Sequence, residues 1–325
     1  MSFFSILIAL LLEQARPLAT HNPVHRSVRL WADAVARALD AGEQRQAWVT
    51  WGVMMAVPAL LAMLIHWLLN HTLGWVLAVV WNIALLYVTL GFRHFSHHFT
   101  DIRDALEAGN ESEARERLAR WQRVQVGQIP RSEIVRHVIE YSVIAAHRHV
   151  FGVFFWYAAL SVFGLGPVGA VIYRLAEYVQ RRWQPGALEE ATVSAVLGGV
   201  AARAWTVIDW LPARATALGF AIVGSFEDAM DGWRNHAQQF PDDNDGVILA
   251  ATAGAINIRL GGARLNPGTA EQDQDDLQAP TSGGSSTPGR AADVAHFPQV
   301  VGLVWRTVVV WLVLVALLTM ANLLG

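Results

Sequence analysis

The sequence predicts an all-α integral membrane protein, and three observations lead to that fold class. Charged residues make up only 16% of the 325 residues, below the roughly 25% of an ordinary soluble domain. Several uncharged apolar runs approach the roughly 20 residues that a helix needs to cross a bilayer. No segment alternates apolar and polar side chains over a useful length, so no strand is expected. The lipid bilayer is therefore the first expected partner.

Three of the apolar runs are clear transmembrane helices. The run Trp48–Leu69 is uncharged and carries tryptophans at its ends, where interfacial anchors lie. A second span covers 73–90 after the short turn 70–72, and a third closes the chain at 307–324. The run 2–12 is shorter and lacks a basic start and a small-residue cleavage site. We expect it to form a half-inserted or interfacial helix rather than a signal peptide.

Two further apolar stretches contain helix breakers. The stretch 150–173 is interrupted by Gly164–Pro167, and the stretch 205–224 is interrupted by Pro212. Both features predict a broken or re-entrant helix, because proline removes a backbone donor and glycine weakens a helix.

Asp209 and Arg214 lie on either side of Pro212 in the second of these stretches. Ionisable side chains at membrane depth are costly and often mark a functional interior, so both are candidate site residues. The alternative is an Asp–Arg pair at the water interface.

The distribution of arginine predicts the topology. Segments 13–47 and 91–149 carry five and nine arginines and are expected in the cytoplasm, whereas the turn 70–72 has none and is expected outside. Segment 174–204 carries four more, so a re-entrant hairpin at 150–173 is favoured over a full crossing. The charges do not fix the side of 225–302. The expected location is the bacterial inner membrane, crossed several times.

The remaining segments divide the chain into three parts. Helical spacing with charged faces predicts cytoplasmic helices over 91–149, with breaks at Gly109–Asn110 and Ile129–Pro130. A membrane domain is expected over 1–265. It is followed by a disordered linker over 266–292, rich in Pro, Gly, Ser and acidic residues, and by a C-terminal transmembrane helix over 303–325.

The residues that are missing exclude several functions. The chain has no Cys, and all 24 of its basic residues other than histidine are Arg. A P-loop lysine, a Schiff-base lysine, a thiolate nucleophile and a cysteine metal site are therefore excluded. The net charge of −3 does not favour a nucleic-acid partner.

A histidine cluster is a candidate metal site. His94, His97, His98 and Asp101 have the spacing of one helix face. Such side chains bind divalent metals or donate hydrogen bonds to phosphate, although a solvated histidine face gives the same pattern.

Two other polar patterns could be either functional sites or ordinary structural features. Arg136 and Glu140 are four residues apart, a spacing that also describes a surface ion pair. The acidic run 242–246 is either a cation-binding turn or a plain turn, since it lacks the EF-hand pattern. The small residues of 246–262 predict close packing with another helix.

Four stretches resemble the CobD/CbiB family of cobalamin-biosynthesis membrane proteins. Asn22-Pro23-Val24 resembles an early segment of the family, and Asp101–Trp121 followed by Glu133–Glu140 is similar to its cytoplasmic helices. The segment Ala201–Leu218, with Pro-Ala-Arg at 212–214, and the block Asn244–Gly262 carry the most specific likeness.

The resemblance implies amide ligation: an aminopropanol phosphate or related amine is joined to a carboxylate of adenosylcobyric acid, a corrinoid substrate. ATP with Mg²⁺ would be required, and a homo-oligomer or membrane partner is also expected. The implied catalytic residues are Glu140 and Arg136. The implied substrate-binding residues are Arg214, Asn244 and Arg259, with arginine taking the place of lysine on phosphate. Asp209 is added to them as a candidate because it is an ionisable residue at membrane depth.

Three polar motifs of the family are replaced in this chain. The family's Gly-Arg-Asp-Thr reads Gly127–Pro130, a second motif is lost at Val143–Ala145, and a third reads Leu175–Trp183. This pattern of replaced motifs is also similar to AmpE, a membrane modulator of β-lactamase induction. The N-terminal run and the segment Asp209–Arg214 resemble AmpE as well. Three hypotheses therefore stay open: a diverged ligase, a non-catalytic regulator, and a histidine-dependent membrane protein that binds a metal or small ligand.

Overall fold

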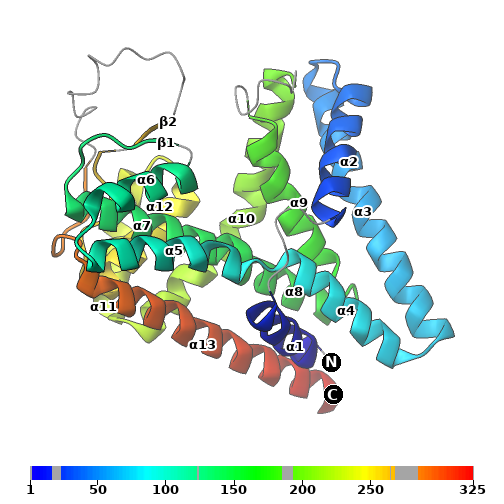
Figure 1. Ribbon diagram of the computed structural model, residues 1–325. Helices are drawn as coiled ribbons and strands as arrows, with labels where there is room; N and C mark the ends of the chain where they lie inside the picture. The colour runs from blue at the N-terminus through cyan, green and yellow to red at the C-terminus, as the bar shows by residue number, and fades with distance from the viewer. Residues whose placement is uncertain are drawn as a thin grey trace. The chain divides into compact units, whose positions relative to one another are not determined.

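The computed structural model describes residues 2–16, 23–122, 124–184, 193–263, 265–267 and 285–324, and these are almost entirely helical (Figure 1). The described part of the chain forms two compact units. The first contains residues 1–92, 148–212 and 311–325, and the second contains residues 93–147 and 213–310. The all-α membrane fold class is confirmed. Two strands of two residues each, β1 (Val124–Gln125) and β2 (Asn266–Pro267), form a minimal antiparallel pair.

The first unit is built from apolar helices. It contains α1 (Ser2–Ala15), α2 (Pro23–Leu39), α3 (Gln44–Thr72), α4 (Trp75–Thr89), α8 (Gly152–Val162) and α9 (Val168–Arg182). The helix α4 packs against α1 and α3, and α9 packs against α3 and α8. Apolar side chains of α3 such as Leu60 and Leu64 remain exposed, as expected of a surface that faces lipid.

The second unit contains most of the polar helices. It contains α5 (Phe92–Glu107), α6 (Glu111–Gln122), α7 (Arg131–Ala146), α11 (Phe226–His236) and α12 (Asp243–Ala255). Short 3₁₀ turns lie at Ala237–Gln239 and Val294–His296. The predicted breaks at Gly109–Asn110 and Ile129–Pro130 are confirmed, because α5, α6 and α7 end and begin on either side of them.

Within the described residues, four helices are long and apolar enough to cross a membrane: Gln44–Thr72, Arg131–Val162, Ala195–Val223 and Val294–Ala321. The predicted spans at 48–69 and 307–324 lie within the first and last of these. The predicted span at 73–90 is the shorter apolar helix α4. Residues Arg131–Val162 form one continuous helix, because a π-helical turn at His147–Phe151 joins α7 to α8 where the sequence predicted separate elements.

The predicted break at Gly164–Pro167 is confirmed, since α8 ends at Val162 and α9 begins at Val168. Gly164 and Gly166 both have positive φ, at 73° and 52°, a conformation that glycine adopts without a steric penalty. Whether this hairpin is re-entrant remains a prediction.

The predicted break at Pro212 is wrong. The helix α10 (Ala195–Val223) runs through this residue without interruption. Proline cannot donate to the carbonyl four residues earlier, which belongs to Ile208. The indole N–H of Trp156 donates to that carbonyl at 3.1 Å, so the lost intrahelical bond is replaced. Pro58 in α3 likewise leaves the Met54 carbonyl without its intrahelical donor. The indole N–H of Trp31 donates to this carbonyl at 3.5 Å.

Small residues bring α11 and α12 into close contact, as the composition of 246–262 predicted. A Cβ atom on Gly254 would lie 2.1 Å from the carbonyl oxygen of Asp228 on α11. A Cβ on Gly232 of α11 would lie 2.5 Å from the carbonyl oxygen of Ala250. The backbones of the two helices therefore approach one another too closely for any larger residue at these positions.

The predicted linker 266–292 needs a correction at its C-terminal end. Residues 268–284 lie outside the described residues. Residues 285–292 pack against the chain that follows α12: Thr287 is buried, and its backbone N–H donates to the Leu260 carbonyl at 2.8 Å. Isolated bridges join Ile258 to Arg290 and Gly261 to Ser286. Residues 285–292 are therefore ordered by backbone hydrogen bonds, which the composition of the segment did not indicate.

Candidate functional site

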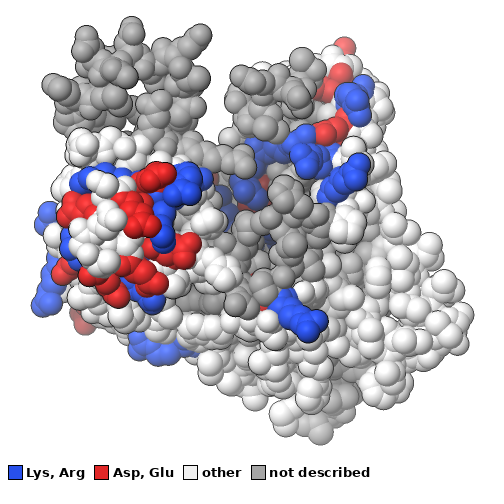
Figure 2. Space-filling model, viewed as in Figure 1, with Lys and Arg blue, Asp and Glu red and all other residues white. Residues whose placement is uncertain are grey.

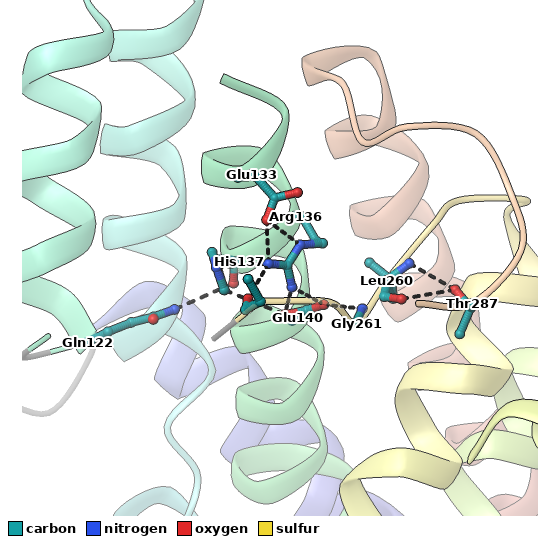
Figure 3. A network of polar contacts seen from close by, with 9 residues as sticks. Gln122, Glu133, Arg136, His137, Glu140, Leu260, Gly261 and Thr287 are labelled. Carbon is teal, nitrogen blue, oxygen red and sulfur yellow. Dashed lines mark hydrogen bonds and ion pairs between the residues drawn. The ribbon is translucent and has the colours of Figure 1, made fainter. Parts of the chain in front are cut away.

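Arg136 lies on α7 at the centre of a buried polar network in the second unit (Figure 3). Its side chain is only 5% exposed. Nε and Nη2 donate to Glu133, and Nη1 donates to both carboxylate oxygens of Glu140 at 3.0 and 3.1 Å. Nη2 also donates to the Ala263 carbonyl at 2.7 Å. The pair Arg136–Glu140 is therefore an interior network rather than the surface ion pair that the spacing also allowed.

Glu140 joins α7 to the segment that follows α12. The backbone N–H of Gly261 donates to its Oε1 at 2.6 Å. Gly261 and Gly262 have φ values of 83° and 105°, in the left-handed region that favours glycine. The Gly-Gly turn thus lets the backbone present this N–H to a carboxylate 121 residues earlier in the chain. His137 completes the network, with Nε2 at 3.0 Å from Nη2 of Arg136.

The same segment is held from its other side by Thr287. The Leu260 N–H donates to Oγ1 of Thr287 at 2.9 Å, and this hydroxyl donates back to the Leu260 carbonyl at 3.2 Å (Figure 3). Residues 258–263 are therefore fixed between α7 and residues 286–290. This segment also carries Arg259, whose side chain is exposed and whose Nη2 lies 3.4 Å from the Gly289 carbonyl.

Arg136 already uses its three nitrogens within the protein. A guanidinium group has five N–H donors, and here they face two carboxylates, a backbone carbonyl and a histidine ring. An arginine in this state positions its neighbours rather than offering a free fork to an anion. Arg259, in contrast, has an exposed side chain.

Arg214 and Asn244 form a second polar contact in the same unit. Nη1 of Arg214 on α10 donates to Oδ1 of the buried Asn244 at 3.0 Å. Asn244 lies in the first turn of α12, where Asp242 is the N-cap and accepts from the backbone N–H of Asn244 at 3.0 Å. The acidic run 242–246 therefore begins a helix. Since α12 packs against α7, the helices that carry Asn244 and Glu140 pack against each other.

Asp209 lies in the first unit, whereas the other five residues expected at the site lie in the second. It is fully buried, and the Tyr173 hydroxyl donates to its Oδ1 at 2.8 Å. Its role as a site residue stays a prediction.

The histidine cluster remains a prediction. His98 stacks on Trp121 with ring centroids 5.5 Å apart, and burial lowers its pKa although Asp101 opposes the shift and His97 adds to it. The side chain of His94 lies outside the described residues. Among the side chains that the structure does describe, no three potential ligands gather as a metal site.

The sequence did not reveal two groups of polar residues. Thr287 lies in the range predicted to be a linker, and no local pattern connects it to Leu260. The second group is Arg174, Glu177 and Arg181 on α9, where Glu177 is buried between two arginines. The spacing of this group, i, i+3 and i+7, was a signal for a shared helix face.

Comparisons with known proteins cover the elements that carry these residues. The family described as CobD/Cbib protein matches residues 6–287. The chain is similar to the cobalamin biosynthesis protein CobD of Stutzerimonas stutzeri, with 30% identity over 95% of each chain. It is also similar to proteins of that name from Chromobacterium violaceum, with 32% identity over 57% of each chain, and from Mycobacterium tuberculosis, with 41% identity over 20% of this chain and 22% of the relative. No solved structure matches.

Proposed function

The chain belongs to the CobD/CbiB family, and on that premise we propose that it acts in cobalamin biosynthesis as an amide ligase of the bacterial inner membrane. The reaction would join the amine of an aminopropanol-phosphate-type substrate to a carboxylate of adenosylcobyric acid. An amide bond forms between the two, and ATP hydrolysis would supply the free energy.

The observation that supports this proposal best is the network of Arg136, Glu140 and Gly261. It connects two blocks that carry the family resemblance, α7 and the segment 258–263, through hydrogen bonds of 2.6 to 3.1 Å. A carboxylate that is held by an arginine and a backbone N–H is fixed in place, and such fixed groups are what substrate positioning requires.

We assign separate roles to the candidate residues. Arg136 and Glu140 hold the segment 258–263 in position, and Arg259 contacts the phosphate or carboxylate of the substrate. Arg214 is a second anion contact, oriented by Asn244. Arginine suits these roles because its planar fork matches the geometry of phosphate and carboxylate.

ATP and Mg²⁺ enter this proposal through the family resemblance alone. The described residues do not form a three-ligand metal group, and the chain has no lysine for a P-loop. Magnesium at nucleotide sites needs only one or two protein carboxylates besides the phosphates, so it would be carried by the nucleotide. We derive no step through it. The alternative of an AmpE-like regulator gains no support from the relatives reported above.

The proposal is tested by complementation. The chain is expressed in bacteria that lack their own amide ligase, under conditions in which growth depends on the completed corrinoid. We expect growth to be restored by the native chain. The variant Arg259→Gln should lower the rate of corrinoid amidation about 10- to 100-fold, because a lost charge-assisted hydrogen bond is worth roughly 1.5–3 kcal/mol.

The control is Arg103→Gln, which removes a partly exposed arginine that pairs with Asp104 and Glu107 on the surface. This variant should complement like the native chain. Absence of growth with the native chain, when its abundance in the membrane is normal, would contradict the proposed activity.

A further inference from the structure

The helix α2, in the first unit, separates apolar and charged side chains onto two faces. Its buried side chains are all apolar: Ala32, Val35 and Ala36. Arg26, Arg29 and Arg37 are exposed. Their spacing of i, i+3 and i+11 puts these three arginines on one side of the helix, away from the buried residues. The exposed side of α2 is therefore a basic face.

The arginines of this basic face have no carboxylate partner in the described part of the chain. Asp33 is the only acidic residue of α2, and both of its oxygens accept from Arg182 of α9 at 2.8 Å. Nε of Arg37 donates at 3.2 Å to the backbone carbonyl of Asp33, which carries no formal charge. Arg26 and Arg29 form no ion pair with any described side chain. The three positive charges therefore remain available to a partner outside the chain.

The helix α2 lies beside the beginning of α3, one of the helices that can cross a membrane. The indole N–H of Trp31 donates to the Met54 carbonyl at 3.5 Å, and the Thr50 hydroxyl donates to the Leu39 carbonyl at 3.0 Å. Arg45, in the first turn, is the only Arg, Asp or Glu residue of α3, so its apolar run begins directly after this turn. These contacts place α2 at the end of that run, where lipid headgroups lie.

Exposed apolar side chains accompany the arginines of α2. Val24 is 43% exposed and Leu30 is 57% exposed. A helix that exposes both kinds of side chain is suited to the boundary between headgroups and acyl chains, because arginine stems can lie along apolar surface while the guanidinium groups reach the phosphates. Figure 2 shows basic side chains over α2 and α9, next to a surface over α3 and α4 that carries no charged side chains in this view.

We propose that the basic face of α2 binds the headgroups of anionic phospholipids in the adjacent leaflet. Guanidinium groups form charge-assisted hydrogen bonds to phosphate oxygens, and anionic lipids attract basic segments that lie close to the membrane surface. A zwitterionic headgroup has no net charge, so it gains less from the three arginines. The predicted topology puts residues 13–47 in the cytoplasm, which makes this leaflet the cytoplasmic one. The proposal does not depend on the ligase activity.

The experiment uses the full chain in detergent micelles, titrated with phosphatidylglycerol or with phosphatidylcholine of the same acyl chains. Native mass spectrometry counts the bound lipids and gives the affinity of the first one. We expect the native chain to bind phosphatidylglycerol more tightly. Arg26→Gln and Arg29→Gln should each reduce this preference about fivefold, and the double variant should reduce it further, as expected for basic residues near a membrane surface.

Two controls separate charge from structure. Arg120→Gln on α6 removes an arginine that is 68% exposed and lies 3.6 Å from Glu116, and it should bind both lipids like the native chain. The double variant Arg26→Lys with Arg29→Lys keeps both charges and should keep most of the preference. Equal affinity of the native chain for the two lipids would overturn the proposal, as would a preference that the double glutamine variant retains. A loss as large with lysine as with glutamine would also overturn it, because the arginines would then act through the fold.

Discussion

At the scale of single residues, a distant donor decides whether proline breaks an apolar helix. Pro212 leaves the Ile208 carbonyl without its intrahelical partner, and Trp156, 52 residues away from Ile208 in sequence, supplies the missing N–H. No local pattern around Pro212 contains that information. The break at Pro212 was therefore predicted where the structure has a continuous helix, whereas the break at Gly164–Pro167 was correctly predicted from adjacent residues.

Removal of the indole donor should destabilise the first unit. We expect Trp156→Phe to lower the free energy of unfolding by about 1–3 kcal/mol, because a buried carbonyl loses its partner. The measurement is reversible denaturation in detergent. In the background Pro212→Ala, which restores the backbone N–H, the same substitution should cost clearly less. Equal costs in both backgrounds would show that the indole acts through packing alone.

The buried Glu177 predicts a pH dependence with a defined sign. Arginines lower its pKa in the folded protein, so the folded state favours the ionised form more than the unfolded state does. The ionised Glu177 therefore adds to the free energy of unfolding. This stabilisation is fully present above the pKa of the unfolded state, about 4.3, and is lost as the pH falls through the lower pKa of the folded state. We expect the native chain to lose stability relative to Glu177→Gln on acidification below about pH 4, measured by thermal unfolding at several pH values. A difference that stays constant with pH would contradict this account.

At the scale of elements, the contact between α11 and α12 depends on the absence of side chains. Gly254→Ala would place a Cβ 2.1 Å from the Asp228 carbonyl oxygen, so the backbones must separate. We expect a loss of about 1–3 kcal/mol in thermal or denaturant unfolding. Gly199→Ala in α10 is the matched control, because a Cβ there meets nothing within 4 Å. It should be neutral or slightly stabilising, and an equal loss at both positions would refute the packing argument.

The elements themselves were largely predictable from local patterns. The apolar run at 48–69, the breaks at Gly109–Asn110 and Ile129–Pro130, and the small residues of 246–262 each correspond to a feature of the structure. The continuous helix Arg131–Val162 was not predicted, because the polar residues near His147 resemble a boundary. A π-helical turn carries the chain through them instead.

The candidate site was predictable only in part. The spacing of Arg136 and Glu140 indicated a pair, but not its burial or its bond to Gly261, which depends on contact over 121 residues. Thr287 and its bonds to Leu260 were hidden within a segment that composition marked as a linker. Long-range contacts of this kind leave no trace in local periodicity, so the structure was needed to separate positioning residues from exposed ones.

At the scale of the whole molecule, the absence of cysteine makes the topology directly testable. Single substitutions Glu43→Cys, His71→Cys and Gln184→Cys introduce one thiol each into a chain that has none. With an impermeant thiol reagent on intact cells, we expect labelling only at position 71 from outside, in agreement with the arginine distribution. Labelling at position 184 from outside would show that 150–173 crosses the membrane fully.

The central claim is that this membrane protein joins an amine phosphate to a corrinoid carboxylate. The most direct measurement is mass spectrometry of the corrinoid after the purified chain has been incubated with adenosylcobyric acid, aminopropanol phosphate, ATP and Mg²⁺. We predict a product heavier by the amine minus one water. The product should be made about 10- to 100-fold more slowly by Arg259→Gln, as expected for a lost charge-assisted hydrogen bond. An unchanged corrinoid mass, with a folded chain in the membrane and a known ligase active under the same conditions, would contradict the claim.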